Sequence, residues 1–178
     1  MHRCLAMLTA ILLPVTLSAC GESGGTSDAA PATDTTTSAP WMLAAAPEGA
    51  QPVTEIKASA REGDRVIMRA RIGGRVTPMN PGSPVFTVMD LAIPYCPPEE
   101  GCPTPWDYCC ETPETILANA ATVQVVGSAS KPTSIMPDAA GLEPLDEIIV
   151  VGAVGPRPNA NVLTIRAESI YAVPTPER

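Results

Sequence analysis

Residues 65–76 read Arg-Val-Ile-Met-Arg-Ala-Arg-Ile-Gly-Gly-Arg-Val, and this stretch decides the fold. Apolar residues alternate with mostly polar ones from Arg65 to Ile72, which is the period of a strand with one buried face. The residues expected on the buried face are Val66, Met68, Ala70 and Ile72. Gly73-Gly74 interrupts the pattern before Arg75-Val76, as expected where a strand bulges or bends sharply to enter a barrel. The stretch therefore predicts the long, kinked first strand of a small barrel.

Four further segments downstream have the composition of strands. They are rich in β-branched residues, are bounded by Gly, Pro or Asn, and cover residues 85–92, 121–126, 147–154 and 162–173. Residues 48–60 fit an extended segment and a helix equally well. With the first strand, these segments predict a mainly β domain that contains a small five-stranded barrel.

The order of these segments resembles the OB-fold. The resemblance rests on GDRVIMRARIGGRV at 63–76, FTVMD at 86–90, DEIIVVGAVG at 146–155 and LTIRAESI at 163–170. It covers residues 62–173 and implies an OB-like barrel. The helix that usually lies between the third and fourth strands is restricted here to a turn or two by Pro132, Pro137 and Pro144. Another small antiparallel barrel or a sandwich is the alternative.

Residues 1–19 have the features of an export signal. Arg3 supplies a positive charge, and the apolar run at 5–17 is too short to span a bilayer permanently. The run ends in Leu17-Ser18-Ala19-Cys20, which resembles the lipobox of bacterial lipoproteins. This resemblance implies cleavage before the cysteine and lipidation of Cys20. A plain secretory signal, cut at the same small residues, is the alternative.

Residues 20–47 are predicted to be the lipidated cysteine and a disordered tether. Residues 21–40 contain no Lys, Arg or large apolar residue, so they bury too little surface to offset their chain entropy. The barrel domain is expected at 48–178, with a cysteine-rich insert at 94–120. By resemblance to Gram-negative sorting rules, Gly21 favours the outer membrane in such a cell. The expected location is therefore the cell envelope, with the domain held by a lipid anchor.

Charge and composition exclude several classes of function. The net charge is −8, and removal of Arg3 with the signal makes the mature chain more negative still. Such a chain repels nucleic-acid backbones unless its positive charge is segregated. The single histidine, His2, also leaves with the signal, which excludes histidine-dependent hydrolysis and histidine-ligated zinc or haem. With no catalytic constellation left, the mature protein is predicted not to be an enzyme.

The distinctive segment is the insert, which runs Tyr95-Cys96-Pro-Pro-Glu-Glu-Gly-Cys102-Pro-Thr-Pro-Trp106-Asp107-Tyr108-Cys109-Cys110-Glu111. It resembles the CPTPWDYCC-type insert of uncharacterised exported bacterial proteins, and the resemblance implies no activity. Trp106 and Tyr108 are expected to pack over the cysteines. The following Thr112-Pro113-Glu114 offers a capping residue, a proline for the first helical position and an acid in the first turn, which predicts a short helix at 114–119.

Two disulfides are the predicted state of the four cysteines, Cys96, Cys102, Cys109 and Cys110. Clustered cysteines in an exported, proline-rich loop without its own core usually act as covalent staples. A bond between the adjacent Cys109 and Cys110 requires a strained ring, so Cys96 and Cys102 are each expected to pair with one of them. Accordingly, neither a metal nor a cofactor is predicted.

Two alternatives remain for the same cysteines. The first is a four-thiolate site for zinc, copper(I) or an iron–sulfur cluster, although the spacing differs from the paired Cys-x2-Cys of ordinary zinc knuckles. The second is a redox-active vicinal dithiol. Asp107 and Glu111 argue against the second, because nearby carboxylates raise thiol pKa values.

Five arginines lie in or near the first strand: Arg61, Arg65, Arg69, Arg71 and Arg75. Arg65, Arg69 and Arg71 share one strand face, so they are candidates for binding phosphate or an acidic glycan. The favoured interpretation is that they pair with carboxylates on neighbouring elements or keep the strand face soluble. Nucleic acid is disfavoured as a partner, because an outer cell surface offers little of it.

These features predict a membrane-anchored, extracytoplasmic lipoprotein with a non-catalytic binding or scaffolding barrel. Its partner, an envelope protein or a glycan, is not identified by the residues. The alternative is an envelope metal-binding or redox protein that uses the four cysteines. A weaker alternative is binding of nucleic acid or an acidic polymer through the arginines, since fold alone does not imply function.

Overall fold

The computed structural model describes residues 39–97, 99, 101–127 and 133–175. The predicted signal peptide, Cys20 and the tether up to residue 38 lie outside the described residues. The elements are β1 (Gln51–Pro52), α1 (Val53–Ser59), β2 (Arg65–Ile72), β3 (Val85–Met89), η2 (Pro105–Asp107), α2 (Pro113–Asn119), β4 (Ala120–Val125), β5 (Glu147–Val154) and β6 (Thr164–Ala172). Within this part of the chain, no helix has the length and apolar character that crossing a membrane requires.

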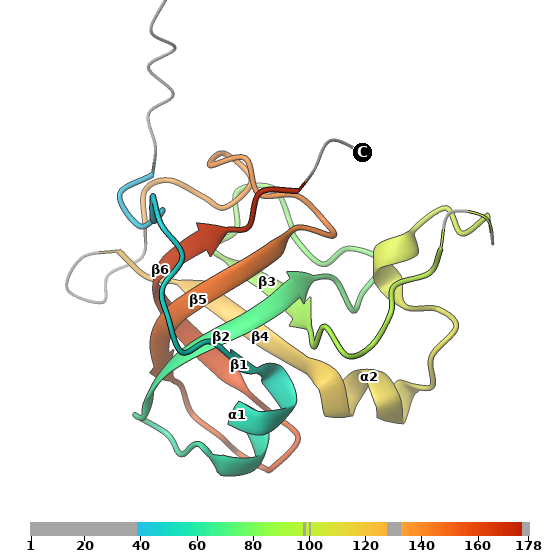
Figure 1. Cartoon of the computed structure of the whole chain (residues 1–178), viewed down its shortest axis with the longest axis horizontal. Helices are drawn as coiled ribbons and strands as arrows, with labels where there is room; N and C mark the ends of the chain where they lie inside the picture. The colour runs from blue at the N-terminus through green and yellow to red at the C-terminus, as the bar shows by residue number, and fades with distance from the viewer. Residues whose placement is uncertain (1–38, 98, 100, 128–132, 176–178) are drawn as a thin grey trace, which may run out of the picture. The chain divides into compact units, whose positions relative to one another are not determined.

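Five of the strands close into a barrel (Figure 1). Their order is β2-β3-β4-β6-β5, and pairing of β5 with β2 closes the ring. β4 and β6 run parallel, while the other neighbours around the ring are antiparallel. The short β1 adds to β2 in parallel, outside the ring. This mainly β, OB-like barrel confirms the fold class predicted from the sequence.

The first strand of the barrel has the predicted register. Along β2 every second side chain is buried, and Met68, Ala70 and Ile72 are fully inaccessible to solvent. Arg65 and Arg69 face outward, as alternation requires. A slip by one residue would place arginines in the core, so burial of this face holds the register.

The strand ends earlier than the sequence suggests. β2 stops at Ile72, and the expected continuation through Arg75-Val76 is wrong, because Val76 is 66% exposed and belongs to no strand. Gly74 has a φ of +87°, a conformation that side chains with a Cβ rarely adopt. The two glycines therefore end the strand and turn the chain, instead of bending a strand that continues.

The helix that packs on the core is α1, and not a helix between the third and fourth strands of the barrel, β4 and β5. Val53 and Ile56 on α1 are fully buried within the hydrophobic cluster, and Figure 1 shows α1 at one end of the barrel. Between β4 and β5, the described residues contain turns but no helix, and near Pro137 the Ala140 N–H donates to the Met136 carbonyl at 3.0 Å. The prolines therefore limit that connection as predicted, and the ambiguous segment at 48–60 contains the helix.

The N-terminal end of α1 is held by a carboxylate from the end of β3. Asp90 is only 2% exposed, and its Oδ2 accepts from the Thr54 backbone N–H at 2.9 Å and the Thr54 hydroxyl at 2.8 Å. Its Oδ1 accepts from the backbone N–H of Ala92 at 2.9 Å. This turn ends β3 at Met89, which is why the strand is shorter than the predicted 85–92.

Asp90→Ala should lower the free energy of unfolding by about 2 kcal/mol, because it removes the carboxylate that accepts the Thr54 and Ala92 backbone N–H groups. Urea unfolding of the full chain, followed by circular dichroism, measures the loss. Glu62→Ala, at an exposed position, is the control and should change stability by less than about 0.5 kcal/mol. Equal effects of the two changes would contradict the capping role.

Part of the predicted tether packs on the barrel. Trp41 is 3% exposed, and its indole N–H lies 3.0 Å from Thr133 Oγ1 and 3.1 Å from the Ile135 carbonyl. Its own carbonyl accepts from Ile170 N–H at 2.8 Å. The folded domain therefore includes Trp41, upstream of the boundary expected at residue 48.

Candidate metal centre

The insert leaves the barrel after β3 and returns to it at α2 and β4. Its centre is the short 3-10 helix η2, followed by Tyr108 in the left-handed region with a φ of 58°. Asp107 organises this turn: its Oδ2 accepts from the Thr104 hydroxyl at 2.6 Å and its Oδ1 from the Cys109 backbone N–H at 2.8 Å. The turn places Cys109 and Cys110 opposite the two cysteines that precede it.

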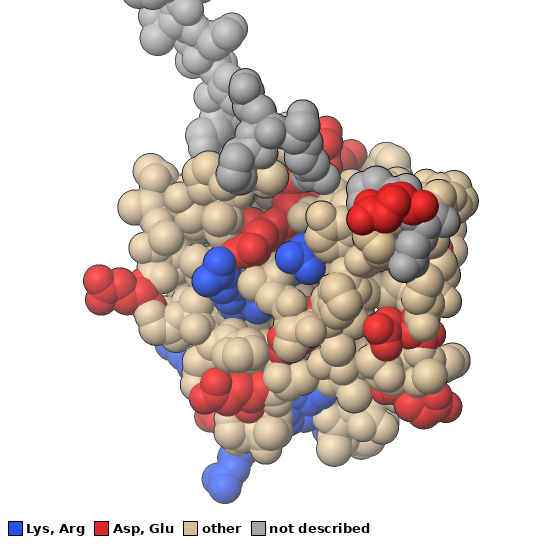
Figure 2. Space-filling view, turned by 45° about the vertical axis from the view of Figure 1, so that its right-hand side comes forward, with Lys and Arg blue, Asp and Glu red and all other residues tan. Residues whose placement is uncertain are grey.

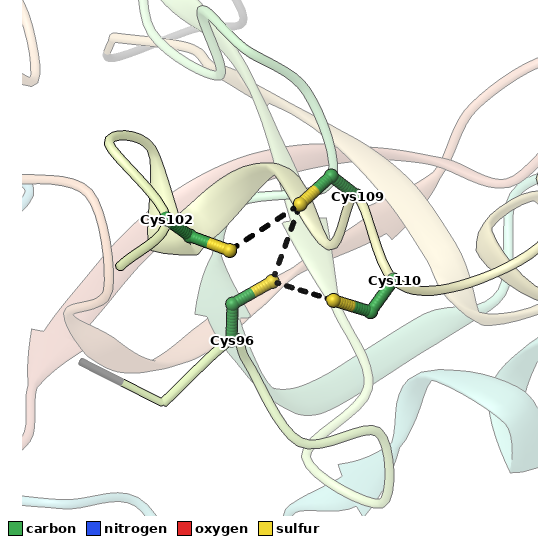
Figure 3. Close-up of side chains that lie close together, drawn as sticks. All are labelled: Cys96, Cys102, Cys109 and Cys110. Atoms are coloured by element: carbon green, nitrogen blue, oxygen red, sulfur yellow. Dashed lines mark hydrogen bonds between the residues drawn. The ribbon is translucent and has the colours of Figure 1, made fainter. Parts of the chain in front are cut away.

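All four cysteine sulfurs of the insert point toward one another (Figure 3). Cys109 Sγ lies 3.6 Å from Cys102 Sγ and 3.7 Å from Cys96 Sγ. Cys96 Sγ lies 3.8 Å from Cys110 Sγ, and all four sulfurs are within 4.8 Å of one another. A tetrahedron of thiolates about 2.3 Å from a zinc ion has edges of about 3.8 Å. The cluster therefore has the size of a mononuclear tetrathiolate site.

No disulfide joins these cysteines in the described part of the chain. Their sulfurs are separated by much more than the roughly 2.05 Å of an S–S bond. The predicted pairing of Cys96 and Cys102 with Cys109 and Cys110 stays a prediction. Among the three short contacts, the combination that uses each sulfur once is Cys102 with Cys109 and Cys96 with Cys110.

Hydrogen bonds within the cluster change the pKa values of Cys96 and Cys109 in opposite directions. Burial opposes ionisation of Cys96, but hydrogen bonds from the Cys110 backbone N–H and from the other thiols outweigh it, so the pKa of Cys96 is lowered. Hydrogen bonds to Cys102 and Cys96 raise the pKa of Cys109, and Asp107 adds a smaller contribution. Binding of a soft cation by these four sulfurs would release the thiol protons.

The position of Cys109 bears on the redox alternative. A reactive cysteine needs a lowered pKa, whereas the pKa of the exposed Cys109 thiol is raised. The nearby carboxylates were expected to have this effect, but the neighbouring thiols contribute more. The raised pKa therefore argues against a nucleophilic thiolate at this position.

Tyr108 fixes the insert to the barrel. It is fully buried, and its ring packs against Gly73. Burial raises the pKa of its phenol, and the nearby positive charge of Arg71 only partly offsets this. Its hydroxyl has no hydrogen-bond partner among the described residues. Of the two aromatic residues expected over the cysteines, Tyr108 is thus buried, whereas Trp106 is only half-buried.

The backbone around Trp106 pairs with the turn after β2. Gly74 N–H donates to the Trp106 carbonyl at 2.8 Å, and the Trp106 indole N–H donates to the Val76 carbonyl at 3.0 Å. A Cβ on Gly73 would lie 2.6 Å from the Trp106 carbonyl oxygen and 2.9 Å from Tyr108 Cε2. The sequence predicted that the two glycines interrupt the strand. It did not predict that they contact Trp106 and Tyr108 of the insert.

Gly73→Ala should therefore cost about 1–3 kcal/mol of stability, because a backbone oxygen and a buried ring must both move. Gly155→Ala is the matched control, since its Cβ would meet its neighbours at 3.4–3.5 Å, an ordinary contact. Urea unfolding of both variants measures the difference. A Gly73→Ala variant as stable as Gly155→Ala would show that the insert does not dock as described.

The three candidate binding arginines contact other side chains of the same chain. Arg65 forms a two-pronged ion pair with Glu168 at 2.8 and 2.9 Å, and Arg69 pairs with Glu147. The Arg71 guanidinium lies 5.0 Å from the centre of the Tyr95 ring. On the face of the molecule that Figure 2 shows, basic and acidic side chains lie next to one another, with no continuous positive area. Binding of an external anion by these three residues stays a prediction, and the contacts within the chain compete with it.

Comparison with known proteins adds no assignment. No protein-family model and no curated protein matches the chain. The case for a function therefore rests on the barrel and on the four-cysteine cluster.

Proposed function

We propose that the protein is an exported, lipid-anchored envelope protein whose barrel carries a zinc ion bound by Cys96, Cys102, Cys109 and Cys110. The observation that carries the metal is the convergence of the four sulfurs within 4.8 Å. Four protein ligands leave no open position for a substrate, which is typical of structural rather than catalytic zinc. The barrel then acts as a binding or scaffolding domain, without catalysis.

Zinc fits the four sulfurs better than an iron–sulfur cluster does. Neighbouring sulfurs 3.6–3.8 Å apart leave room for one ion between them, whereas an iron–sulfur cluster brings inorganic sulfide as well. A tetrahedral set of four thiolates is a usual site for zinc. The donor N–H of Cys110 on Cys96 is the kind of second contact that stabilises a bound thiolate.

A bound ion would stabilise an insert that buries few of its own side chains. No residue of η2 or α2 is buried, so Tyr108 and Cys96 contribute most of the insert's burial. Four metal–sulfur bonds would hold this segment against the β2–β3 turn. A bound zinc ion, and not the two disulfides expected from the sequence, would then hold the insert through the same four cysteines.

Metal and thiol analysis of the full-length, lipidated protein tests the proposal. The protein is extracted from membranes without chelator or reductant, and its metal content is measured by plasma mass spectrometry. About one zinc per chain, with four thiols that react only after unfolding and chelation, is the expected result.

The opposite result is equally specific. A metal-free protein whose mass is lower by about four hydrogens than that of its reduced form contains two disulfides. That result would overturn the metal centre and restore the covalent staples. The sulfur contacts then predict the pairs Cys102 with Cys109 and Cys96 with Cys110, which peptide mapping would identify.

A further inference from the structure

A cavity of about 550 Å³ lies between α2 and the outer face of the barrel. Its floor includes Thr87 on β3 and residues 120–122 of β4, and the loop before β6 closes one side at residues 161–163. This volume is in the range of pockets that enclose small molecules. The cavity is distinct from the cysteine cluster, since none of the four cysteines lines it.

The walls of the cavity are mostly apolar. α2 buries none of its residues, yet its Ile116 and Leu117 line the cavity, and Leu117 is 50% exposed. The opposite walls carry Ala120, Ala121, Val162 and Leu163. The apolar side chains of α2 thus face a space that the barrel does not fill. An apolar molecule would gain burial there that the protein itself does not provide.

A polar contact fixes the C-terminal end of α2. Lys57 Nζ, from α1, donates to the Leu117 carbonyl at 2.7 Å and to the Ala120 carbonyl at 2.6 Å. At the other end, the Thr112 hydroxyl accepts from Thr115 N–H at 3.2 Å and caps the helix itself. The Lys57 contacts therefore tie the end of α2 to α1, beside the cavity.

One charged group at the cavity is available to a ligand. Arg75 lines the cavity and makes no ion pair with any residue that the structure describes, in contrast to Arg65 and Arg69. A guanidinium at an apolar pocket is suited to a carboxylate.

We propose that this cavity binds a small amphiphilic carboxylate, with its apolar chain between α2 and β4 and its carboxylate at Arg75. The apolar walls disfavour strongly hydrated anions, and the positive charge disfavours cations. Octanoate is a suitable probe, because it has a short saturated chain and one carboxylate.

Saturation-transfer NMR with the full-length protein, as purified in lipid nanodiscs, tests the proposal. Octanoate should bind saturably, beyond its partition into empty nanodiscs. Arg75→Ala should weaken octanoate binding about tenfold, the effect of losing a charge-assisted contact. Octan-1-ol, which lacks the carboxylate, should be unaffected by the same change. Leu117→Ser, at an exposed position, should weaken both ligands by a similar factor.

Arg65→Ala is the matched control, since it removes an arginine on the outer face of the barrel that is not part of the cavity. It should leave octanoate affinity unchanged. Absence of saturable octanoate binding would overturn the proposal, as would equal weakening by Arg75→Ala and Arg65→Ala. Binding of octan-1-ol as tight as that of octanoate would overturn the carboxylate assignment. Thermal unfolding of each variant verifies that the barrel is intact.

Discussion

Cys102→Ser or Cys109→Ser should reduce bound zinc from about one per chain to near zero. A serine hydroxyl is a poor replacement for a thiolate, and the three remaining ligands leave one tetrahedral position without its donor. Changes that only touch the surroundings of a metal ligand already cost 10–100-fold in affinity, so loss of a ligand should cost more. Plasma mass spectrometry of the purified, full-length variants measures the change.

Loss of the ion should loosen the insert and leave the barrel folded. Two amides report on the insert: Gly74 N–H, bonded to Trp106, and Cys96 N–H, bonded to the Pro105 carbonyl at 3.1 Å. Amides between β2 and β5, such as the Met68 and Val150 pair, report on the barrel. Hydrogen exchange should be accelerated at the first set and nearly unchanged at the second, because the barrel has its own buried core.

Glu111→Gln is the control for both measurements, since it changes a carboxylate next to the cysteines without removing a sulfur. It should keep its zinc and its protected amides. If the serine variants also kept one zinc per chain, the four-thiolate centre would be wrong. Loss of protection throughout the barrel would show instead that the insert and the barrel unfold together.

Cys20→Ala should move nearly all of the protein out of the mature membrane-bound form. The lipidation signal requires the cysteine, and several acyl chains on one residue account for stable membrane binding. Without them, an unprocessed precursor or a released chain is expected. Fractionation of cells followed by immunoblotting distinguishes precursor, membrane-bound and soluble forms.

Cys4→Ala is the matched control, because Cys4 lies in the predicted signal and should be removed with it. This variant should be processed and anchored like the unaltered protein. A Cys20→Ala protein that is cut to mature length and stays tightly membrane-bound would overturn the anchor assignment. A plain secretory signal predicts instead that neither change affects processing.

Local patterns were sufficient for most of the secondary structure. β5 has the predicted bounds, and β2 has the predicted buried face, because alternation and β-branched residues act over neighbouring positions. The Thr-Pro-Glu sequence correctly marked α2, whose first turn uses Thr112 as its cap. The segment at 48–60 stayed ambiguous, because Pro52 and the cap from Asp90 together select the helix and Asp90 is distant in sequence.

The functional sites depended more on distant contacts. The sequence identified the four cysteines as a group, but a loop with prolines gives no separations between sulfurs. Those separations come from the Asp107 turn and from docking of Trp106 and Tyr108 against Gly73. The cavity at Arg75 was not predicted at all, because its walls come from α2, β3, β4 and the loop before β6.

By itself, the sequence determined the barrel class, the buried face of β2 and which cysteines lie together. It also predicts the export signal, which lies outside the described residues. These follow from composition and from periodicities of two and about four residues, which act locally. Only the tertiary structure decided the closure of β2 on β5, the convergence of the four sulfurs and the space beneath α2. The closure and the cavity join segments far apart in the chain, and the sulfurs converge within a loop whose shape depends on docking against Gly73. These positions are set by packing, which no local pattern encodes.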